Sequence, residues 1–482
     1  MVGETKDKRF VILGAGPAGM GAAWELSKRG AKHVVVLDKN DRVGGLARTE
    51  KFQGYFFDVG PHRMMTKYAE VEDLWKKMLG KDLLVRPRIT RIYYRGRFFQ
   101  YPLKMVNALY NLGLIQSMLA GASFLKAQLV WRNKEPKNFA EWTTKTFGNR
   151  ISKAFFRDYT KKVWGIEADE VGVDWAGQRI KPIKILDVFG ELVKSMFTME
   201  QVKNIGAQFF YPRYGAGMFY EKMQQELEVL GVKFLLNSKI IAVRCEESCI
   251  RAVTVETAAG REDVEGDVFI SSIPSNLLVA SMTPPASKNV LELTKAMRFR
   301  AHIVVNMIIK RKDLFEDSWF YIQSTDVRIA RIGNYGQFSS DMLADPNTSA
   351  IGIEFFCYEG DEFWNKKDDE LIELALREMT ELGLVRHEEF GGAYVIRSDD
   401  AYPTYYMGYR EKFAALRAFL EQFQNLRLIG RAGMYKYKDQ DHAMYTGMLT
   451  VRNLFGEHHD VWELGEEQEF FEEKTVSQTP KK

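Results

Sequence analysis

One segment, Phe10-Val-Ile-Leu13-Gly14-Ala-Gly16-Pro-Ala-Gly19, sets the architecture that we expect for this chain of 482 residues. The apolar run predicts a buried strand, the glycines predict a tight turn, and the residues after them follow a helical pattern. Gly14 permits the turn, Gly16 lets backbone N–H groups approach a pyrophosphate, and Gly19 lets the helix pack close to the strand. The segment therefore predicts a strand, turn and helix that bind phosphate groups.

A second apolar run, His33 to Leu37, ends in Asp38, 19 residues after Gly19. A carboxylate at this distance from the glycines accepts hydrogen bonds from the diol of a ribose. It would also repel a 2′-phosphate, which disfavours NADP at this site. We therefore expect an adenine dinucleotide without a 2′-phosphate.

Composition and charge narrow the class of protein. Hydrophobic residues make up 46% and charged residues 27% of the chain, as in ordinary folded domains. The net charge is 68 − 64 = +4 and no basic block is present, so we expect no nucleic-acid partner. The three cysteines form no CxxC pair, which argues against a zinc site or a disulfide framework, and we expect no metal. At this length we expect two or three lobes.

The sequence contains no signal-peptide pattern and no run of 18 apolar residues, so we expect a cytoplasmic protein without a transmembrane segment. The most apolar region, Leu112 to Leu129, is interrupted by polar residues and predicts a buried or amphipathic helix. Peripheral membrane contact stays open there. The oligomeric state is not indicated.

The residues after Asp38 carry a second signature, Arg42-Val-Gly44-Gly45-Leu-Ala-Arg48. It resembles the second motif of the flavoprotein superfamily that includes amine oxidases, protoporphyrinogen oxidases and UDP-galactopyranose mutases. The resemblance implies non-covalent FAD, with Gly44, Gly45 and Arg48 near its pyrophosphate. It also implies an α/β fold, in which an FAD-binding Rossmann-like domain of the glutathione reductase type is interleaved with an α+β substrate domain.

Three further segments resemble UDP-galactopyranose mutases in particular. They are Asp58-Val-Gly60-Pro61-His62, then Tyr159-Thr-Lys-Lys-Val-Trp164-Gly165 with the following Arg179-Ile180, and Gly430-Arg431-Ala-Gly433-Met-Tyr435-Lys-Tyr437-Lys-Asp439-Gln-Asp441. The resemblance implies catalytic roles for His62, Arg179, Arg300, Tyr435 and Tyr437, and substrate contacts from Tyr159, Trp164, Arg179 and Arg300. It implies FAD contacts from Gly14, Gly16, Gly19, Asp38, Gly44, Gly45, Arg48, Gly60, Val243, Gly430, Arg431, Asp441 and Met444.

Each of these side chains also has a plain structural interpretation. His62 could bond backbone in a buried turn, Trp164 could be a packing anchor, and Arg300 could be a structural surface residue. Tyr435 and Tyr437 could be alternating residues of a strand.

The same resemblance divides the chain into interleaved parts. We expect an FAD-binding domain built from 1–61, 215–286 and 411–465, a mainly helical substrate or lid region over 62–214, and a substrate-domain sheet over 287–410. We expect the charged tail, 466–482, to be mobile.

Two reactions remain open. A mutase-like enzyme would isomerise a small substrate, such as a nucleotide sugar, by flavin N5 chemistry without net redox change, with NADPH or NADH as an optional external reductant. An oxidase or desaturase of the amine oxidase or protoporphyrinogen oxidase type would instead transfer hydride from its substrate to flavin N5. Met65, Lys181 and Lys184 depart from the mutase pattern and favour the second reading.

Overall fold

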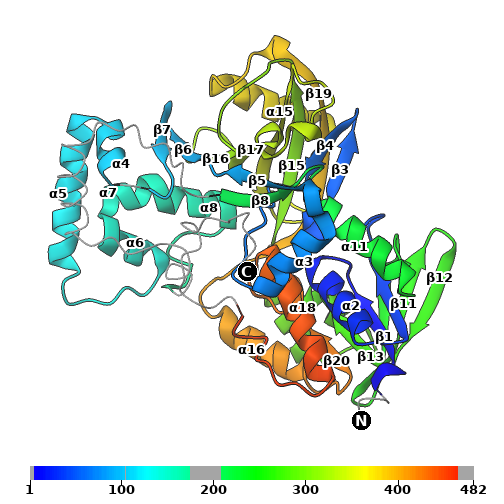
Figure 1. Ribbon diagram of the computed structural model, residues 1–482. Coiled ribbons are helices and arrows are strands. Elements are labelled where there is room, and N and C mark those ends of the chain that lie inside the picture. The colour runs from blue at the N-terminus through cyan, green and yellow to red at the C-terminus, as the bar shows by residue number, and fades with distance from the viewer. Residues whose placement is uncertain (1–4, 104, 174–207, 465–482) are drawn as a thin grey trace.

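The computed structural model describes residues 5–103, 105–173 and 208–464 (Figure 1). Arg179, Lys181, Lys184 and the tail predicted to be mobile lie outside these ranges. Within them, no helix has the length and mean hydropathy needed to cross a membrane.

Five short strands form a parallel sheet in the order β20-β13-β1-β2-β9. They are β1 (Arg9–Leu13), β2 (His33–Leu37), β9 (Lys233–Leu235), β13 (Val268–Ser271) and β20 (Leu426–Leu428). The central strand β1 is buried along Phe10 to Leu13, as expected for a parallel sheet that is covered on both faces. Three distant parts of the chain thus complete one Rossmann-like sheet, and the predicted fold class is confirmed.

Two helices on one face of this sheet meet backbone to backbone. Helix α2 (Pro17–Lys28) lies beside α18 (Gln440–Leu454) in Figure 1. A Cβ atom on Gly447 would lie 2.1 Å from the carbonyl oxygen of Ala18, and one on Gly21 would lie 2.3 Å from that of Met444. Glycines on both helices therefore allow the C-terminal helix to seat directly on the first one.

A four-stranded sheet of order β12-β11-β10-β14 adjoins this unit. Its strands are β10 (Lys239–Glu246), β11 (Cys249–Thr257), β12 (Gly260–Glu265) and β14 (Met282–Thr283). Further helices around the two sheets are α3 (Ala69–Leu79), α11 (Gly217–Val229), α12 (Ser275–Ala280), α13 (Lys288–Ala296), α16 (Tyr409–Leu420) and α17 (Gly430–Gly433).

The second large unit is a seven-stranded sheet of order β19-β15-β18-β17-β16-β6-β7. Its strands are β6 (Thr90–Tyr94), β7 (Arg97–Gln100), β15 (Phe299–Ile309), β16 (Trp319–Ile322), β17 (Arg331–Asn334), β18 (Ser349–Cys357) and β19 (Phe390–Pro403), with α15 (Asp368–Glu381) packed on β15 and β19. Every residue of β15 and β18 is buried. The sheet joins a part of the chain before residue 101 to a part after residue 298.

A helical lobe projects from the side of this sheet in Figure 1. It comprises α4 (Met105–Leu112), α5 (Leu114–Val130), α6 (Phe139–Phe147), α7 (Asn149–Ser152), a π-helical turn (Lys153–Arg157) and α8 (Asp158–Trp164). The range 62–214 also supplies strands β5 (Leu83–Pro87) and β8 (Gln208–Pro212), which pair antiparallel, besides β6 and β7. Strand content in this range is therefore larger than the sequence pattern indicated.

Short elements complete the chain: β3 (Thr49–Phe52), β4 (Tyr55–Asp58), α14 (Tyr335–Phe338) and the 3₁₀ turns Gly45–Ala47, Gly80–Asp82, Ser340–Met342 and His387–Glu389. Buried Asp58 joins the first two of the three chain segments that form the dinucleotide-binding unit, because its carboxylate accepts hydrogen bonds from Thr49 Oγ1 at 2.6 Å and from the N–H of Ala216 at 3.1 Å. Burial raises the pKa of Asp58 to about 7, although these hydrogen bonds act to lower it.

Candidate active site

The glycines of the two N-terminal motifs face each other at the carboxyl end of β1. Gly14 has a φ of +101°, which a residue with a side chain adopts only with strain. Gly16 caps the N-terminus of α2, and a Cβ atom on Gly45 would lie 3.0 Å from the Cα of Gly16. The two loops thus approach each other without side chains between them, beside the positive end of a helix. This cradle fits the pyrophosphate of a dinucleotide.

Gly19 explains why the helix can start so close to the turn. A Cβ atom on Gly19 would lie 1.9 Å from the carbonyl oxygen of Gly14. Any side chain at this position would therefore push α2 away from the turn and open the cradle.

The side chains of Asp38 and Arg48 form hydrogen bonds with the backbone of the two glycine loops that make up the cradle. Asp38 Oδ2 accepts the N–H of Ala15 at 2.7 Å, and Oδ1 accepts the N–H of Asn40 at 2.8 Å. Arg48 Nη1 donates to the carbonyl of Gly45 at 3.0 Å. Oδ1 also accepts Asn40 Nδ2 at 2.7 Å, whereas Oδ2 can accept a second hydrogen bond, so the predicted ribose contact stays compatible with this arrangement.

Four further residues predicted to contact FAD are buried. Gly430 packs against Ala18, and its N–H donates to Thr446 Oγ1 at 3.0 Å. Met444 and Asp441 are buried in α18, and Val243 is buried in β10. Their roles toward FAD stay predictions.

Gln440 connects the start of α18 to the loop that contains His62. Its Nε2 atom donates to the carbonyls of His62 at 3.1 Å and of Arg63 at 3.0 Å, while the hydroxyl of Tyr220 donates to its Oε1 atom at 2.9 Å. The sequence predicted no role for Gln440. The only available signal was its place inside the Asp439-Gln-Asp441 segment.

The His62 side chain forms a hydrogen bond with the backbone, as one of its two interpretations predicted. Its Nδ1 atom lies 2.8 Å from the carbonyl oxygen of Gly60. A carbonyl only accepts, so Nδ1 carries the proton, and in the neutral ring Nε2 is left as an acceptor. Burial, together with the nearby Arg431, lowers the pKa of His62 to about 4. The ring is therefore neutral at physiological pH and can still serve a ligand through Nε2.

A group of three side chains, two of them buried, lies under this loop. Glu354 is fully buried, and its carboxylate accepts Arg331 Nε at 2.5 Å, Arg331 Nη2 at 2.6 Å and His302 Nε2 at 2.7 Å. Burial acts to raise the pKa of Glu354, but the pairing with Arg331 and His302 outweighs it and lowers this pKa to about 2. A Cβ atom on Gly60 would lie 3.2 Å from the His302 ring. We call these residues the Arg331–Glu354–His302 group.

The sequence did not predict this group. Its signal was the single carboxylate of Glu354 inside the apolar run Ile351-Gly-Ile-Glu-Phe-Phe356, because a buried carboxylate is almost always paired.

Tyrosines and a second arginine surround the same place. The rings of Tyr402 and Tyr437 stack at 5.9 Å with an angle of 13° between their planes. The guanidinium of Arg431 lies 5.0 Å from the Tyr402 ring and 4.6 Å from the Tyr437 ring, and it donates through Nη2 to the carbonyl of Lys438 at 2.7 Å. Trp164 meets Tyr402 edge to face at 6.2 Å. The structure thus brings Trp164 into one cluster with Arg431 and Tyr437, which the sequence had selected from a distant segment.

Tyr159 adjoins this cluster, and its ring meets Tyr321 edge to face at 6.0 Å. Burial raises the pKa of the Tyr159 hydroxyl well above its usual value. In the same motif, Lys162 donates to three backbone carbonyls, those of Ile322, Ser324 and Ile329. Lys162 therefore fixes α8 on the sheet.

Arg300 is a buried cation. Its Nε atom donates to the carbonyl of Val163 at 2.9 Å, and its guanidinium lies 4.3 Å from the ring of Tyr358. Only 4% of the residue is exposed, so the interpretation as a surface arginine is wrong. Burial lowers the pKa of Arg300. Among the described residues, no carboxylate forms an ion pair with it, which leaves its charge available to an anionic ligand.

Tyr435 lies apart from these groups. Its hydroxyl donates toward the backbone carbonyls of Arg298 at 2.8 Å and Thr404 at 3.0 Å, and its ring is buried among Phe299 and Phe413. Because these contacts occupy the hydroxyl, we assign Tyr435 a structural role and propose no chemistry for it.

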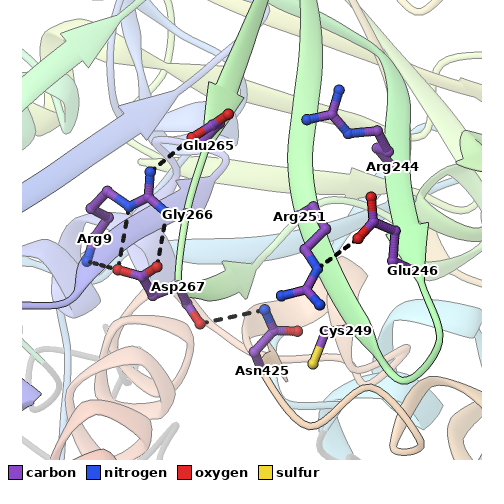
Figure 2. A pocket seen from close by; sticks show the side chains of 9 residues that line it. All are labelled: Arg9, Arg244, Glu246, Cys249, Arg251, Glu265, Gly266, Asp267 and Asn425. Atoms are coloured by element: carbon purple, nitrogen blue, oxygen red, sulfur yellow. Dashed lines mark hydrogen bonds and ion pairs between the residues drawn. The ribbon is translucent and has the colours of Figure 1, made fainter.

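A cavity of about 450 Å³ lies elsewhere (Figure 2). It is lined by residues at the amino ends of β1 and β13, opposite the glycine cradle, and its charged side chains pair with one another, as in Arg9 with Asp267 and Arg251 with Glu246. This cavity holds none of the predicted site residues.

Residues 17–452 match the family of flavin-containing amine oxidoreductases. The chain belongs to this family. Together with the glycine cradle, this membership identifies an FAD-dependent enzyme of the flavin amine oxidase superfamily.

Within this superfamily the chain is similar to enzymes of both classes. It is 40% identical to an L-amino-acid oxidase of Sistrurus catenatus edwardsii over 120 residues, which are 22% of this chain and 23% of that protein. It is 26% identical to the dTDP-fucopyranose mutase of Escherichia coli over 170 residues, 34% of this chain and 43% of that protein. The chain thus spans less than half the length of either relative.

Solved structures match over nearly the whole chain. Reduced UDP-galactopyranose mutase superposes with a TM-score of 0.82 at 21% identity, covering 94% of this chain and 97% of that one. Cyclohexylamine oxidase from Brevibacterium oxydans superposes with a TM-score of 0.62 at 14% identity, covering 93% and 99%. At these identities the likeness shows the fold.

Proposed function

We propose that this flavoenzyme acts on an anionic, nucleotide-sugar-like substrate and isomerises it by flavin N5 chemistry, as a pyranose/furanose mutase does. The observation that carries this proposal is the charge of the site. Three arginines, Arg300, Arg331 and Arg431, approach it, and Glu354 is the carboxylate paired among them. An excess of positive charge at a site largely shielded from water favours a diphosphate over a protonated amine.

A further carboxylate, Asp361, interacts electrostatically with Arg300 but forms no ion pair with it among the described residues. Asp361 accepts the N–H groups of Tyr358 at 2.9 Å and of Trp364 at 2.7 Å, so it caps its own loop.

In this proposal the glycine cradle, with Asp38 and Arg48, holds FAD, and Arg431 lies near its ring system. The bound flavin supplies a nucleophilic or hydride-accepting N5 atom. Arg300 neutralises the leaving diphosphate, together with Arg179 from outside the described residues. The hydroxyls of Tyr159 and Tyr437 bond the sugar or phosphate oxygens, and neutral His62 accepts a hydrogen bond at Nε2 without adding charge.

An oxidase is the second candidate. The 40% identity to a segment of an L-amino-acid oxidase favours it, and a carboxylate substrate would also suit Arg300. NADPH or NADH as an external reductant belongs to the mutase proposal, since an isomerase of this type needs reduced flavin whereas an oxidase starts from the oxidised form.

The test compares the two chemistries on one preparation. The enzyme is reduced with dithionite without oxygen and given UDP-galactopyranose, UDP-glucose or a TDP-deoxysugar, and the sugar products are separated by chromatography. The oxidised enzyme is given L-amino acids and amines with oxygen, and peroxide is measured. Interconversion of pyranose and furanose forms, dependent on reduction by dithionite or NAD(P)H, supports the proposal. Peroxide formation without isomerisation refutes it.

A variant separates substrate binding from folding. Arg300→Met should weaken UDP binding, followed by tryptophan fluorescence, while leaving FAD bound. Lys295→Met is the matched control, since Lys295 is exposed and its ion pair within the described residues is with Glu292. Equal UDP affinity in the two variants would contradict the assignment of Arg300.

A further inference from the structure

Helix α5 carries the densest group of exposed apolar side chains in the described residues. Seven large ones lie on this single helix: Leu114, Ile115, Met118, Leu119, Leu125, Leu129 and Val130. Leu114, Ile115 and Leu129 are 78%, 73% and 77% exposed. Scattered exposed apolar residues need no explanation, but a contiguous patch of this kind marks an interaction site.

The pattern along the helix shows that the patch is one face. At 3.6 residues per turn, these seven positions and Ala122 fall within about half of the helix circumference. The buried positions, Ala120 and Ala127, fall on the opposite side, toward the rest of the lobe. The helix thus packs inward through small residues and points its large apolar residues outward. This arrangement is the reverse of that expected for a helix of a globular core.

The face is accessible in the assembled molecule. In Figure 1, α5 forms the outer edge of the helical lobe, on the side away from both large sheets. A flat partner could therefore reach it without displacing another described element.

Charge indicates which partner this is. Residues 100–134 contain Lys104, Lys126, Arg132 and Lys134 and no aspartate or glutamate. Lys126 is exposed on the apolar face, and Arg132 and Lys134 are exposed at its C-terminal end. Arg150 Nη1 donates to Gln116 Oε1 at 2.9 Å, which adds a fourth described cation beside the helix.

Aromatic residues stand at both ends of the face. Tyr110, just before α5, is 84% exposed, and Trp131 follows the last residue of the helix. Tyrosine and tryptophan prefer the boundary between head groups and acyl chains. An apolar helix face with basic residues around it and aromatic residues at its ends has the composition of an interfacial membrane helix.

We propose that α5 docks this enzyme, with the helix lying flat, on a lipid bilayer that contains anionic head groups. A second copy of the chain is less suited to the face, because twofold symmetry would oppose each helix to an identical one and place its basic residues near those of the partner. Acidic lipids supply the missing negative charge. The inference does not depend on which reaction the flavin performs.

The experiment is a flotation assay of the full-length, FAD-bound protein with vesicles of phosphatidylcholine alone or mixed with phosphatidylserine. The protein should float with the mixed vesicles, and rising salt should weaken this binding. The triple variant Ile115→Ser, Met118→Ser and Leu129→Ser should lower the partition coefficient. About tenfold per side chain is expected if each buries roughly half of its apolar surface.

The matched control replaces exposed apolar residues outside α5 with serine. Val229 and Leu230, at the end of α11, are 88% and 59% exposed, and their double serine variant should bind vesicles as the unchanged protein does. Flavin absorbance verifies that every variant is folded. Failure to float, or equal flotation of the triple variant, overturns the proposal. So does a dimer in sedimentation that dissociates on the triple substitution without any vesicle binding, because the face then belongs to a second copy.

Discussion

Replacing Glu354 with glutamine tests whether the Arg331–Glu354–His302 group supports the fold as a buried ion pair. Glutamine keeps the shape of the side chain but removes its charge, so the Arg331 guanidinium loses its counter-ion at 2.5 and 2.6 Å. Removing one partner of a buried pair costs about 3–5 kcal/mol, mostly because the other charge stays buried alone.

The pKa of Glu354 provides a second measure of the same quantity. This pKa is about 2 in the folded protein, and the ordinary value for glutamate is about 4.3. A difference of about two pKa units corresponds to about 3 kcal/mol of stability from the charged form. The two routes agree on a loss of about 3 kcal/mol for Glu354→Gln at pH 7.

The sign of the pH dependence follows from the lowered pKa. A group with a lowered pKa contributes its full stability above the pKa of the unfolded state, and this contribution is lost as pH falls through the folded value. The difference in unfolding free energy between the parent and Glu354→Gln should therefore be constant above about pH 5 and shrink as pH falls from about 4 toward 2.

The assay is urea unfolding followed by tryptophan fluorescence, at one fixed FAD concentration, because bound ligand changes apparent stability. Glu292→Gln is the control, since its pair with Lys295 is solvent-exposed and such pairs contribute about 0–1 kcal/mol. A loss below about 1 kcal/mol for Glu354→Gln at pH 7, or a difference that does not shrink with acid, would refute the assignment.

Three further predictions concern the cradle and the site. Gly19→Ala should reduce FAD retention at least about 100-fold, because its Cβ atom would lie 1.9 Å from the Gly14 carbonyl, whereas Gly121→Ala, with open space around it, should keep the flavin absorbance after gel filtration. Because the pKa of His62 is lowered to about 4, its ring should titrate there in NMR spectra of labelled histidine, and stability should rise with pH between about 4 and 6.5; a titration near 6.5 would contradict the buried neutral ring. If Arg300 binds a diphosphate, Arg300→Met should weaken UDP binding about tenfold or more and leave FAD content unchanged, as judged by fluorescence titration, and an unchanged affinity would exclude this role.

The local motifs were readable from the sequence because their geometry depends on residues close together in the chain. Gly14, Gly16 and Gly19 occupy one turn. The positive φ of Gly14 and the 1.9 Å approach that a Cβ on Gly19 would make to the Gly14 carbonyl are both set within this turn. The resemblance to the flavoprotein superfamily also predicted the fold class, and the five-stranded parallel sheet confirms it.

The sequence was less informative where a role depends on distant partners. His62 had two interpretations until the carbonyl of Gly60 appeared at 2.8 Å, and Arg300 looked as much like a surface residue as a site residue until its burial was known. Tyr435 and Tyr437 are two positions apart but lie in different surroundings. Tyr435 is buried in a core, whereas the ring of Tyr437 lies against Arg431.

The sequence by itself therefore determined the phosphate-binding turn and the acid at the end of the second strand, since these arise from backbone conformation within about forty residues. The class of cofactor followed from the resemblance of the second motif to the flavoprotein superfamily. Only the tertiary structure decided which charges meet. Arg331, Glu354 and His302 come from three different strands, and their pairing exists only because β15, β17 and β18 lie in one sheet. Side-chain partnership across a sheet depends on register and burial, which no short segment of the chain encodes alone.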